Sequence, residues 1–307
     1  MINGNGDARA LYLDLMKRTL TNWIYGDMEK KVIEFPPTLD QKVMAKAAAI
    51  GAQLVVPHPF DPRKREAGRD WPPSAHTMIG LKRLDNLQFC VQQVIADEVP
   101  GDLIETGVWR GGASIFMRAI LKAFDVKDRC VWVADSFAGL PAPDVEKYPQ
   151  DAGSPLHLYD VLAVSLESVK ANFEKYGLLD EQVRFLQGWF RDTLPAAPIE
   201  KLAVARLDGD MYESTMDALQ SLYPKLSAGG FVIIDDYGSV KACAQAVDDY
   251  RAAHNIDDEI VPIDGWAVYW RRSLNIEPGG IFKPEGDPMN DQWHERDSGF
   301  QPIDRNP

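Results

Sequence analysis

From residue 101 onward, short apolar segments alternate with amphipathic ones, and this rhythm restricts the possible folds more than any other feature. Each apolar segment is followed by a stretch of helical periodicity, and the segments read DLIET, CVWVAD, VRFLQ, LAVARL and FVIID. Strands that alternate with helices predict a doubly wound α/β fold, a mainly parallel sheet with helices on both faces. In such sheets, ligands bind outside the carboxyl ends of the strands.

The N-terminal third has a different pattern, which predicts a helical region over residues 1–99. Helical periodicity occurs at 8–25, 40–53 and 77–97. The apolar face of the first helix is expected to consist of Leu11, Leu15, Leu20 and Ile24. Residues 57–75 contain five prolines and predict a loop that is long enough to be a lid. Residues 100–273 form the expected catalytic domain, and 274–307 an extended C-terminal arm.

The composition restricts the class of protein. The chain has 307 residues, 45% of them hydrophobic, and a net charge of −13, which argues against a nucleic-acid partner. Its three cysteines form neither a paired framework nor a metal-binding spacing, as expected of reduced thiols in a cytoplasmic protein. No segment reads as a signal peptide or a membrane span. We therefore expect a cytoplasmic protein that does not bind membranes.

A glycine-rich turn follows the first strand of this domain. The sequence Glu105-Thr106-Gly107-Val108-Trp109-Arg110-Gly111-Gly112 has glycines that permit close approach of a ligand to the backbone. Its spacing differs from the G-x-G-x-x-G of dinucleotide sites. The carboxylate of Glu105 would repel a pyrophosphate but can pair with an ammonium group, such as that of S-adenosylmethionine. A plain strand-to-helix turn is the alternative interpretation.

Two further strand ends favour a nucleoside-containing cofactor. Asp135 ends the next strand, where a carboxylate can accept hydrogen bonds from both ribose hydroxyls. A helix cap or a loop anion is the alternative for this residue. The third strand ends in Gln187-Gly188-Trp189, where Gln187 could meet the adenine edge and an aromatic neighbour could stack.

Four aspartates follow the fourth and fifth strands. Asp208 and Asp210 end one strand, and Asp235 and Asp236 end the next. Crowded carboxylates repel one another unless a cation holds them together, and an all-oxygen ligand set favours Mg²⁺. Helix caps and solvated turns are the alternative. Asp210 is the expected general base, and Arg206 pairs with one of these acids or is structural.

Several stretches of the chain resemble a known family, the macrocin O-methyltransferase (TylF-type) family of sugar methyltransferases. The resemblance covers most of residues 8–272. The matching stretches are LYLDLMKRTLTNWIY, AHTMIGLKRLDNL, PGDLIETGVWRGGASIFMR, VWVADSFAGLP, RFLQGWFRDTLP, ARLDGDMYEST and GGFVIIDDYG.

The resemblance implies a Rossmann-like core with an N-terminal helical lid, bound S-adenosylmethionine, a Mg²⁺ ion and a homodimer. The family's metal ligands correspond to Asp208, Asp235 and Asp236, and its general base corresponds to Asp210. Its cofactor contacts correspond to Glu105, Thr106, Asp135, Ser136 and the Gln187–Trp189 segment, with Ser165, Thr77 and Met78 as further contacts.

The expected activity is methyl transfer to a hydroxyl of a (deoxy)sugar on a glycosylated natural product, with a small glycoside or polyketide-sugar as acceptor. Three alternatives stay open at this point. Asp208-Gly209-Asp210 is formally the D-x-D of a metal-dependent glycosyltransferase. The acceptor could be a phenol or a catechol, or the domain could be a binding module without catalysis.

Overall fold

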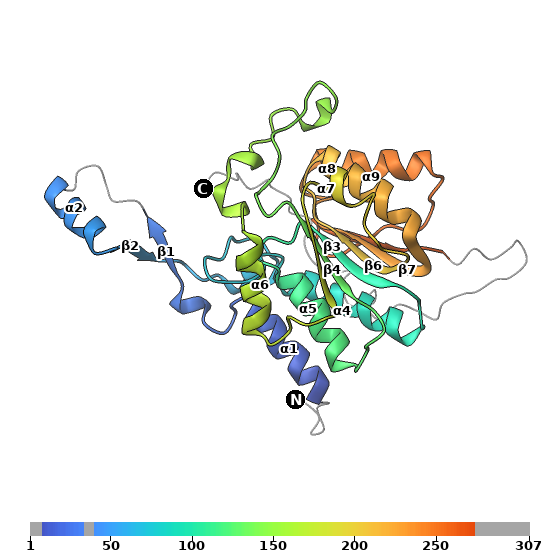
Figure 1. The fold of residues 1–307 in the computed structure, drawn as a ribbon, viewed down its shortest axis with the longest axis horizontal. Coiled ribbons are helices and arrows are strands. Elements are labelled where there is room, and N and C mark those ends of the chain that lie inside the picture. Colours follow the sequence, from blue (N-terminus) through green and yellow to red (C-terminus); the bar gives the residue numbers. More distant parts are fainter. Residues whose placement is uncertain (1–7, 34–39, 274–307) are drawn as a thin grey trace, which may run out of the picture. The chain divides into compact units, whose positions relative to one another are not determined.

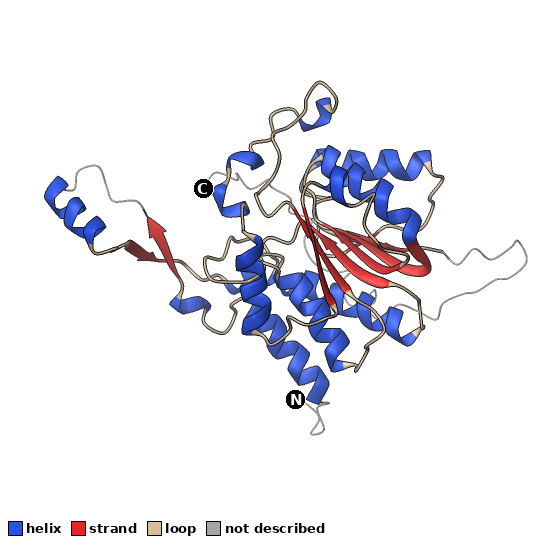
Figure 2. Ribbon diagram, in the orientation of Figure 1, coloured by secondary structure: helices blue, strands red, loops and turns tan. Residues whose placement is uncertain are grey.

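The computed structural model describes residues 8–33 and 40–273, and a sheet of seven strands lies at the centre of this part of the chain (Figures 1 and 2). The strand order is β5-β4-β3-β6-β7-β9-β8. The five strands from β5 to β7 are parallel, and β9 and β8 add antiparallel pairs at one edge. This confirms the predicted doubly wound, mainly parallel sheet. The strands are β3 (Asp102–Thr106), β4 (Val131–Asp135), β5 (Val183–Gln187), β6 (Leu202–Leu207), β7 (Leu226–Ile234), β8 (Val261–Pro262) and β9 (Val268–Arg271).

Helices cover both faces of the sheet, so the central strands have no solvent-facing side. All six residues of β6 are buried, as expected for a parallel strand between two helical layers. One layer contains α1 (Ala8–Leu20), α4 (Gly80–Ala96), α5 (Gly112–Ala123) and α6 (Leu166–Lys175). The other contains α7 (Phe190–Thr193), α8 (Tyr212–Leu222) with the short η5 (Tyr223–Lys225), and α9 (Lys241–Ala253).

Only part of the apolar face predicted for the first helix is buried, because Leu20 is buried but Leu11 and Leu15 are not. Leu13, Met16 and Leu20 are buried, whereas Leu11 and Leu15 are more than half exposed. The buried positions still follow the i, i+3, i+7 spacing of a helix that packs on one side. Because α1 has apolar residues around much of its circumference, periodicity alone did not select the buried stripe.

The segment 57–75 is more ordered than a plain loop. It contains the short helix α3 (Pro62–Glu66), and Asp61 caps this helix through the N–H of Arg63 at 2.9 Å. Arg65 is 1% exposed and donates to Glu29 and Asp70 at 2.6 Å each. These buried ion pairs hold the segment in place. Loss of one partner would leave an uncompensated buried charge, which is strongly destabilising.

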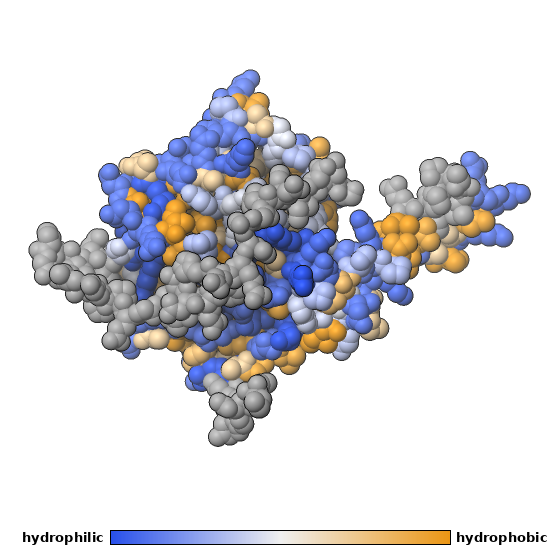
Figure 3. Space-filling model, turned by 180° about the vertical axis from the view of Figure 1, so that it is seen from behind, coloured by the Kyte–Doolittle hydropathy of each residue, from blue (hydrophilic) through white to orange (hydrophobic). Residues whose placement is uncertain are grey.

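Residues 30–33 and 40–57 form a small arm of β1 (Lys30–Ile33), α2 (Gln41–Ala49) and β2 (Leu54–Pro57), preceded by η1 (Gly26–Met28). The two strands pair antiparallel, an arrangement that the sequence analysis did not predict. No described residue of α2 is buried, and all of β1 is exposed. Apolar side chains gather on this arm (Figure 3), and the exposed ones include Val32, Ile33, Val43, Ile50, Val55 and Val56.

Between β4 and α6, the chain forms three short 3₁₀ turns, η2 (Pro149–Asp151), η3 (Leu156–Leu158) and η4 (Asp160–Leu162). The helix α6 begins after these turns, at Leu166. Among the described residues, no helix is both long and apolar enough to cross a membrane. The predicted C-terminal arm, 274–307, lies outside the described residues, and the boundary at residue 99 stays a prediction.

Candidate active site

The carboxyl ends of the parallel strands bring most of the predicted site residues to one edge of the sheet. The pairing register aligns Thr106 with Leu207, and Leu207 with Ile234, so the residues that follow these strands are neighbours. On the other side of β3, Asp135 is paired with Gln187. The predicted cofactor residues thus follow β3, β4 and β5, and the aspartates follow β6 and β7.

The glycine-rich turn after β3 touches the aspartate turn through the backbone. Gly107 has a φ of +79°, and a Cβ atom there would lie 1.8 Å from the carbonyl oxygen of Asp208. The N–H of Asp208 in turn donates to the carbonyl of Thr106 at 2.9 Å. Only glycine satisfies both the left-handed conformation and this close approach.

Glu105, the acid ahead of the turn, is almost fully buried, at 2% exposure. One of its oxygens accepts from Arg206 at 2.7 Å, and the other accepts from the hydroxyl of Ser114. Burial raises the pKa of Glu105, and Arg206 lowers it in part. Both carboxylate oxygens therefore have protein partners. The pairing with a cofactor ammonium that we inferred from the sequence stays a prediction.

Asp135, at the end of β4, joins its strand to the glycine-rich turn. One carboxylate oxygen accepts from the N–H of Val108 at 2.8 Å, and the other accepts from Phe137 at 2.7 Å. Burial raises the pKa of Asp135, and these two backbone N–H groups lower it in part. The hydroxyl of Ser136 donates to the carbonyl of Gly139 at 2.6 Å, which shapes the loop that follows.

The remaining predicted cofactor residues lie on several elements. Gln187 is exposed at the end of β5, and the N–H of Gly188 donates to the carbonyl of Asp135 at 2.9 Å. Trp189 is the residue before α7. Ser165 caps α6 and accepts from the N–H of Ser168 at 3.2 Å. Thr77 and Met78 lie just before Ile79, the N-cap of α4.

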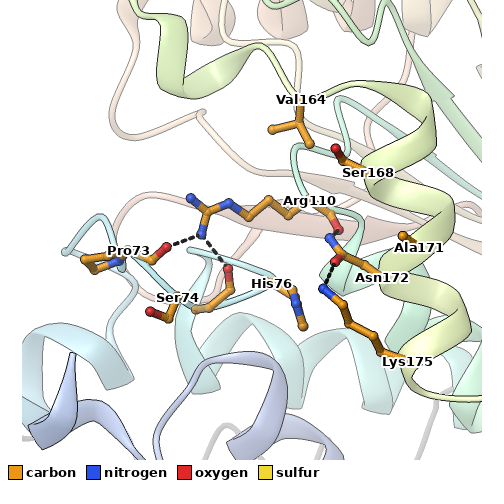
Figure 4. A pocket seen from close by; sticks show the side chains of 10 residues that line it. Pro73, Ser74, His76, Arg110, Val164, Ser168, Ala171, Asn172 and Lys175 are labelled. Carbon is orange, nitrogen blue, oxygen red and sulfur yellow. Dashed lines mark hydrogen bonds between the residues drawn. The ribbon is translucent and has the colours of Figure 1, made fainter. Parts of the chain in front are cut away.

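Arg110 links the glycine-rich turn to the segment before Thr77. Its Nη1 donates to the carbonyl oxygens of Pro73 and Ala75 at 2.8 Å each (Figure 4). It also lines a cavity of about 410 Å³ against α6, and no lining residue carries a carboxylate. The lining residues are Pro73, Ser74, Ala75, His76, Arg110, Val164, Ser168, Ala171, Asn172 and Lys175. The cavity is therefore separate from the acidic cluster.

Three of the four predicted aspartates converge. Asp208, Asp210 and Asp236 each offer a carboxylate oxygen, and these oxygens lie within 4.8 Å of one another. Two of them, Asp208 and Asp236, are predicted metal ligands, and Asp210 is the predicted base. The backbone of Asp210 is left-handed, with a φ of +56°, in the tight turn that leads into α8.

Asp235, the third predicted ligand, is held by two arginines. One of its oxygens accepts from Arg206, and the other accepts from Arg83 at 2.5 Å. Arg206 also donates to Asp208 at 3.0 Å, so it pairs with several acids, in agreement with one of the roles considered for it. Asp235 is not among the three converging aspartates, so its role as a metal ligand stays a prediction.

The electrostatics of the cluster suit a divalent cation. Burial raises the pKa of Asp236, and repulsion from Asp210 and Asp235 raises it further. Burial and repulsion from Asp235 likewise raise the pKa of Asp208. The Oδ2 atom of Asp236 is buried and has no hydrogen-bond partner among the described residues. Converging carboxylates with an unpaired buried oxygen fit a hard, oxygen-seeking ion such as Mg²⁺.

Sequence reasoning missed three residues that position this cluster. Arg83 lies on α4, Asp264 lies between β8 and β9, and Asp151 lies in η2. Arg83 is separated from Asp235 by 152 residues and from Asp264 by 181. Their partners are distant in the chain, so no local periodicity or motif spacing indicated the contacts.

A doubly wound sheet with an acid at the end of β4 and an aspartate cluster beside a glycine-rich turn defines the class of Rossmann-like methyltransferases. Within this class, the chain belongs to the macrocin-O-methyltransferase (TylF) family, whose sequence profile matches residues 9–272. This family consists of O-methyltransferases, so it does not support the glycosyltransferase that the D-x-D sequence suggested. The resemblance noted from the sequence is confirmed.

Three relatives share most of their length with this chain. It is 56% identical over 270 residues to 8-demethyl-8-(2,3-dimethoxy-alpha-L-rhamnosyl)-tetracenomycin-C 4′-O-methyltransferase of Streptomyces olivaceus, covering 87% of this chain and 94% of the relative. It is 54% identical to mycinamicin III 3″-O-methyltransferase of Micromonospora griseorubida, covering 86% and 96%. The solved structure of the O-methyltransferase NovP is 51% identical, with a TM-score of 0.75, and the match covers 87% of this chain and all of NovP.

Proposed function

We propose that this protein transfers the methyl group of S-adenosylmethionine to a sugar hydroxyl of a glycosylated natural product, with Mg²⁺ bound at the aspartate cluster. The observation that carries the proposal is the convergence of Asp208, Asp210 and Asp236 within 4.8 Å, next to the turn that contains Gly107. This arrangement supports a cation site beside the proposed cofactor site, at one edge of the sheet.

The reaction is a displacement at the methyl carbon. The acceptor oxygen forms a bond to this carbon while the carbon–sulfur bond breaks. The electron pair of the carbon–sulfur bond stays on sulfur. The hydroxyl proton must leave, and we assign its removal to a carboxylate oxygen of Asp210. A bound Mg²⁺ ion would lower the pKa of the hydroxyl and hold it in line with the methyl group.

The other residues of this edge are assigned to binding. Asp208, Asp235 and Asp236 would hold the metal ion, and Arg206 orients the carboxylates of Asp208 and Asp235. The cofactor would contact Asp135 and the turn around Gly107, with the adenine near Gln187. The acceptor class rests on the relatives, which are described as acting on a rhamnosyl tetracenomycin and on mycinamicin III.

The test combines cofactor binding with turnover. We expect S-adenosylhomocysteine to bind in a calorimetric titration, and labelled cofactor to methylate members of a panel of glycosides. EDTA should abolish turnover and added Mg²⁺ should restore it. No binding of S-adenosylhomocysteine would reject methyl transfer, and full turnover in EDTA would reject the metal. Methylation of catechols but not of glycosides would replace the acceptor class by the phenolic alternative.

We also propose a homodimer, as the family resemblance implies. The exposed apolar side chains of the arm, among them Val32 and Val55 on its two strands, support an association surface. An isolated two-stranded hairpin is marginally stable in water, so burial against a second copy would stabilise it. Sedimentation velocity should give twice the chain mass, and a monomer at all concentrations would contradict this assignment.

A further inference from the structure

Arg83 reaches from α4 into the acidic edge of the sheet. It is 6% exposed, and it presents different nitrogens to two carboxylates. Its Nη1 lies 2.5 Å from Oδ2 of Asp235, and its Nε lies 2.7 Å from Oδ2 of Asp264. Both carboxylates are themselves buried, with side-chain exposures of 7% and 1%. A two-pronged contact of this kind requires the fork of a guanidinium group.

Asp264 extends this contact to the turn that precedes β9. Its Oδ1 accepts from the N–H groups of Trp266 and Ala267, both at 3.0 Å. The guanidinium of Arg83 lies 5.4 Å from the ring centroid of Trp266. The carbonyl of Trp266 accepts from the N–H of Gly238 at 2.6 Å, two residues after Asp236. Arg83 thus joins α4, the end of β7 and the turn before β9.

We propose that Arg83 is a positioning residue of the metal site, which fixes the direction in which Asp235 presents its carboxylate. Arg206 donates to one oxygen of Asp235 and Arg83 donates to the other, so hydrogen bonds restrain both oxygens of this carboxylate. Each oxygen keeps acceptor capacity toward a cation. The inference rests on the proposed function, because it assumes that a divalent cation binds at this cluster.

A positioning role and a charge-balancing role predict different effects in a variant that keeps the positive charge. Arg83 favours the ionised form of Asp236 through its charge, so deleting that charge could weaken metal binding in either role. If balancing charge were its only role, a lysine at this position would leave metal affinity unchanged. Loss of the contacts that orient a metal ligand lowers affinity, by about 10–100-fold in characterised sites. Weaker binding in a charge-conserving variant therefore indicates the positioning role.

The main variant is Arg83→Lys, which keeps the positive charge and loses the second prong. The probe is Mn²⁺, which suits the same oxygen ligands as Mg²⁺, and free Mn²⁺ is counted by electron paramagnetic resonance. We expect Arg83→Lys to weaken Mn²⁺ binding by about 10–100-fold, with S-adenosylhomocysteine affinity within about twofold of wild type. Asp264→Asn keeps the backbone contacts of its Oδ1 and should weaken Mn²⁺ binding in the same direction.

The matched control is Arg118→Lys. Arg118 lies on α5 and is 5% exposed, and its guanidinium lies 2.7 Å from the carboxylate of Asp180. This pair contains none of the residues of the metal cluster, so the replacement should leave Mn²⁺ affinity unchanged. Mn²⁺ affinity at or above the wild-type value in Arg83→Lys overturns the inference. If that variant does not fold, Asp264→Asn decides in the same way. Wild-type protein that binds S-adenosylhomocysteine but no Mn²⁺ would reject the proposed metal site itself.

Discussion

Asp210 occupies an unusual backbone conformation at the point where chemistry is proposed. Its φ of +56° lies in the left-handed region, which costs most residues about 1–2 kcal/mol but suits aspartate and asparagine. The turn therefore selects a short polar side chain at this position. Asparagine fits the same backbone, so it removes the basic oxygen without straining the turn.

We expect Asp210→Asn to lower kcat by about 10²–10⁴-fold, the range for loss of a general base. Binding of S-adenosylhomocysteine should be unchanged, because Asp210 is not among the proposed cofactor residues. The matched control is Asp125→Asn, an exposed aspartate with a φ of +55°. Steady-state kinetics and calorimetry measure both quantities. Wild-type kcat in Asp210→Asn would remove this residue as the base.

His76 makes the folded protein sensitive to mild acid. Its Nδ1 lies 2.7 Å from the hydroxyl oxygen of Tyr176. Burial lowers the pKa of His76 to about 4, and the charges of Lys175 and Arg110 lower it as well. The unfolded chain binds this proton near pH 6.5, so the stabilising contribution of neutral His76 is complete above about pH 6.5 and is lost as pH falls toward about 4.

We expect the stability advantage of wild type over His76→Gln to shrink by about 1–2 kcal/mol between pH 7 and pH 4.5, after allowance for solvent screening. Urea denaturation at both pH values measures it. The exposed His157, replaced by glutamine, serves as the control and should show no such change. An advantage that stays constant with pH would contradict the assignment to His76.

At the residue scale, the sequence predicted positions better than partners. Asp208 and Asp236 lie together as expected, because they come just after the ends of two adjacent, buried parallel strands. The partners of Asp235 and Glu105 are arginine and serine side chains from other elements, and such long-range pairs have no local pattern. For Glu105, the sequence indicated a cofactor ammonium as partner but not the two protein partners, Arg206 and Ser114, that the structure shows.

Among the elements, α8 depends on a residue far from it in sequence. It begins directly after the turn that contains Asp208 and Asp210, and the side chain of Met211, its N-cap residue, accepts no hydrogen bond from the helix backbone. The buried Asp151 supplies the missing cap, accepting from the N–H groups of Tyr212 at 2.7 Å and Glu213 at 3.1 Å. A negative charge at this end also complements the helix dipole.

Asp151→Ala should destabilise the protein by about 2 kcal/mol, because it leaves two backbone donors at the start of α8 without their acceptor. It should also weaken Mn²⁺ binding, since α8 begins beside Asp210. Asp40→Ala is the control, because Asp40 caps the exposed helix α2. Thermal unfolding and Mn²⁺ titration test both effects. Unchanged Mn²⁺ affinity in Asp151→Ala would separate this cap from the metal site.

The accuracy of the predicted elements follows their burial. The strands from β3 to β7 were predicted because strands between two helical layers form apolar runs of distinctive length. The strands β1 and β2 were missed because α2 separates them, so no short hairpin turn marks their pairing. The helix α3 was hidden in a segment whose prolines indicated a loop, although Pro62 occupies the first turn, where proline is tolerated.

At the scale of the whole molecule, cofactor binding should raise the stability of the fold. Most of the proposed cofactor residues lie on or directly after three adjacent strands of the central sheet, so we expect binding to be linked to global unfolding. At a concentration 100 times Kd, S-adenosylhomocysteine should add about 2.7 kcal/mol, or on the order of 5 °C in melting temperature. Differential scanning calorimetry measures this shift. Asp210→Asn should show the same shift, and its absence in wild type would argue against a cofactor site on the folded protein.

The contact between Gly107 and Asp208 has a consequence for how acceptors diversify among such enzymes. The turn after β3 is proposed to bind the methyl donor, and the turn after β6 the acceptor hydroxyl. These two turns follow neighbouring strands, and their backbones are in contact. The distance between the reacting atoms is then set by main-chain geometry and sheet spacing, which vary little. Surface loops elsewhere in the chain can then change to admit a new sugar, while the distance of the methyl transfer stays the same. A change of acceptor would thus alter the loops, whereas the turns after β3 and β6 would keep the chemistry.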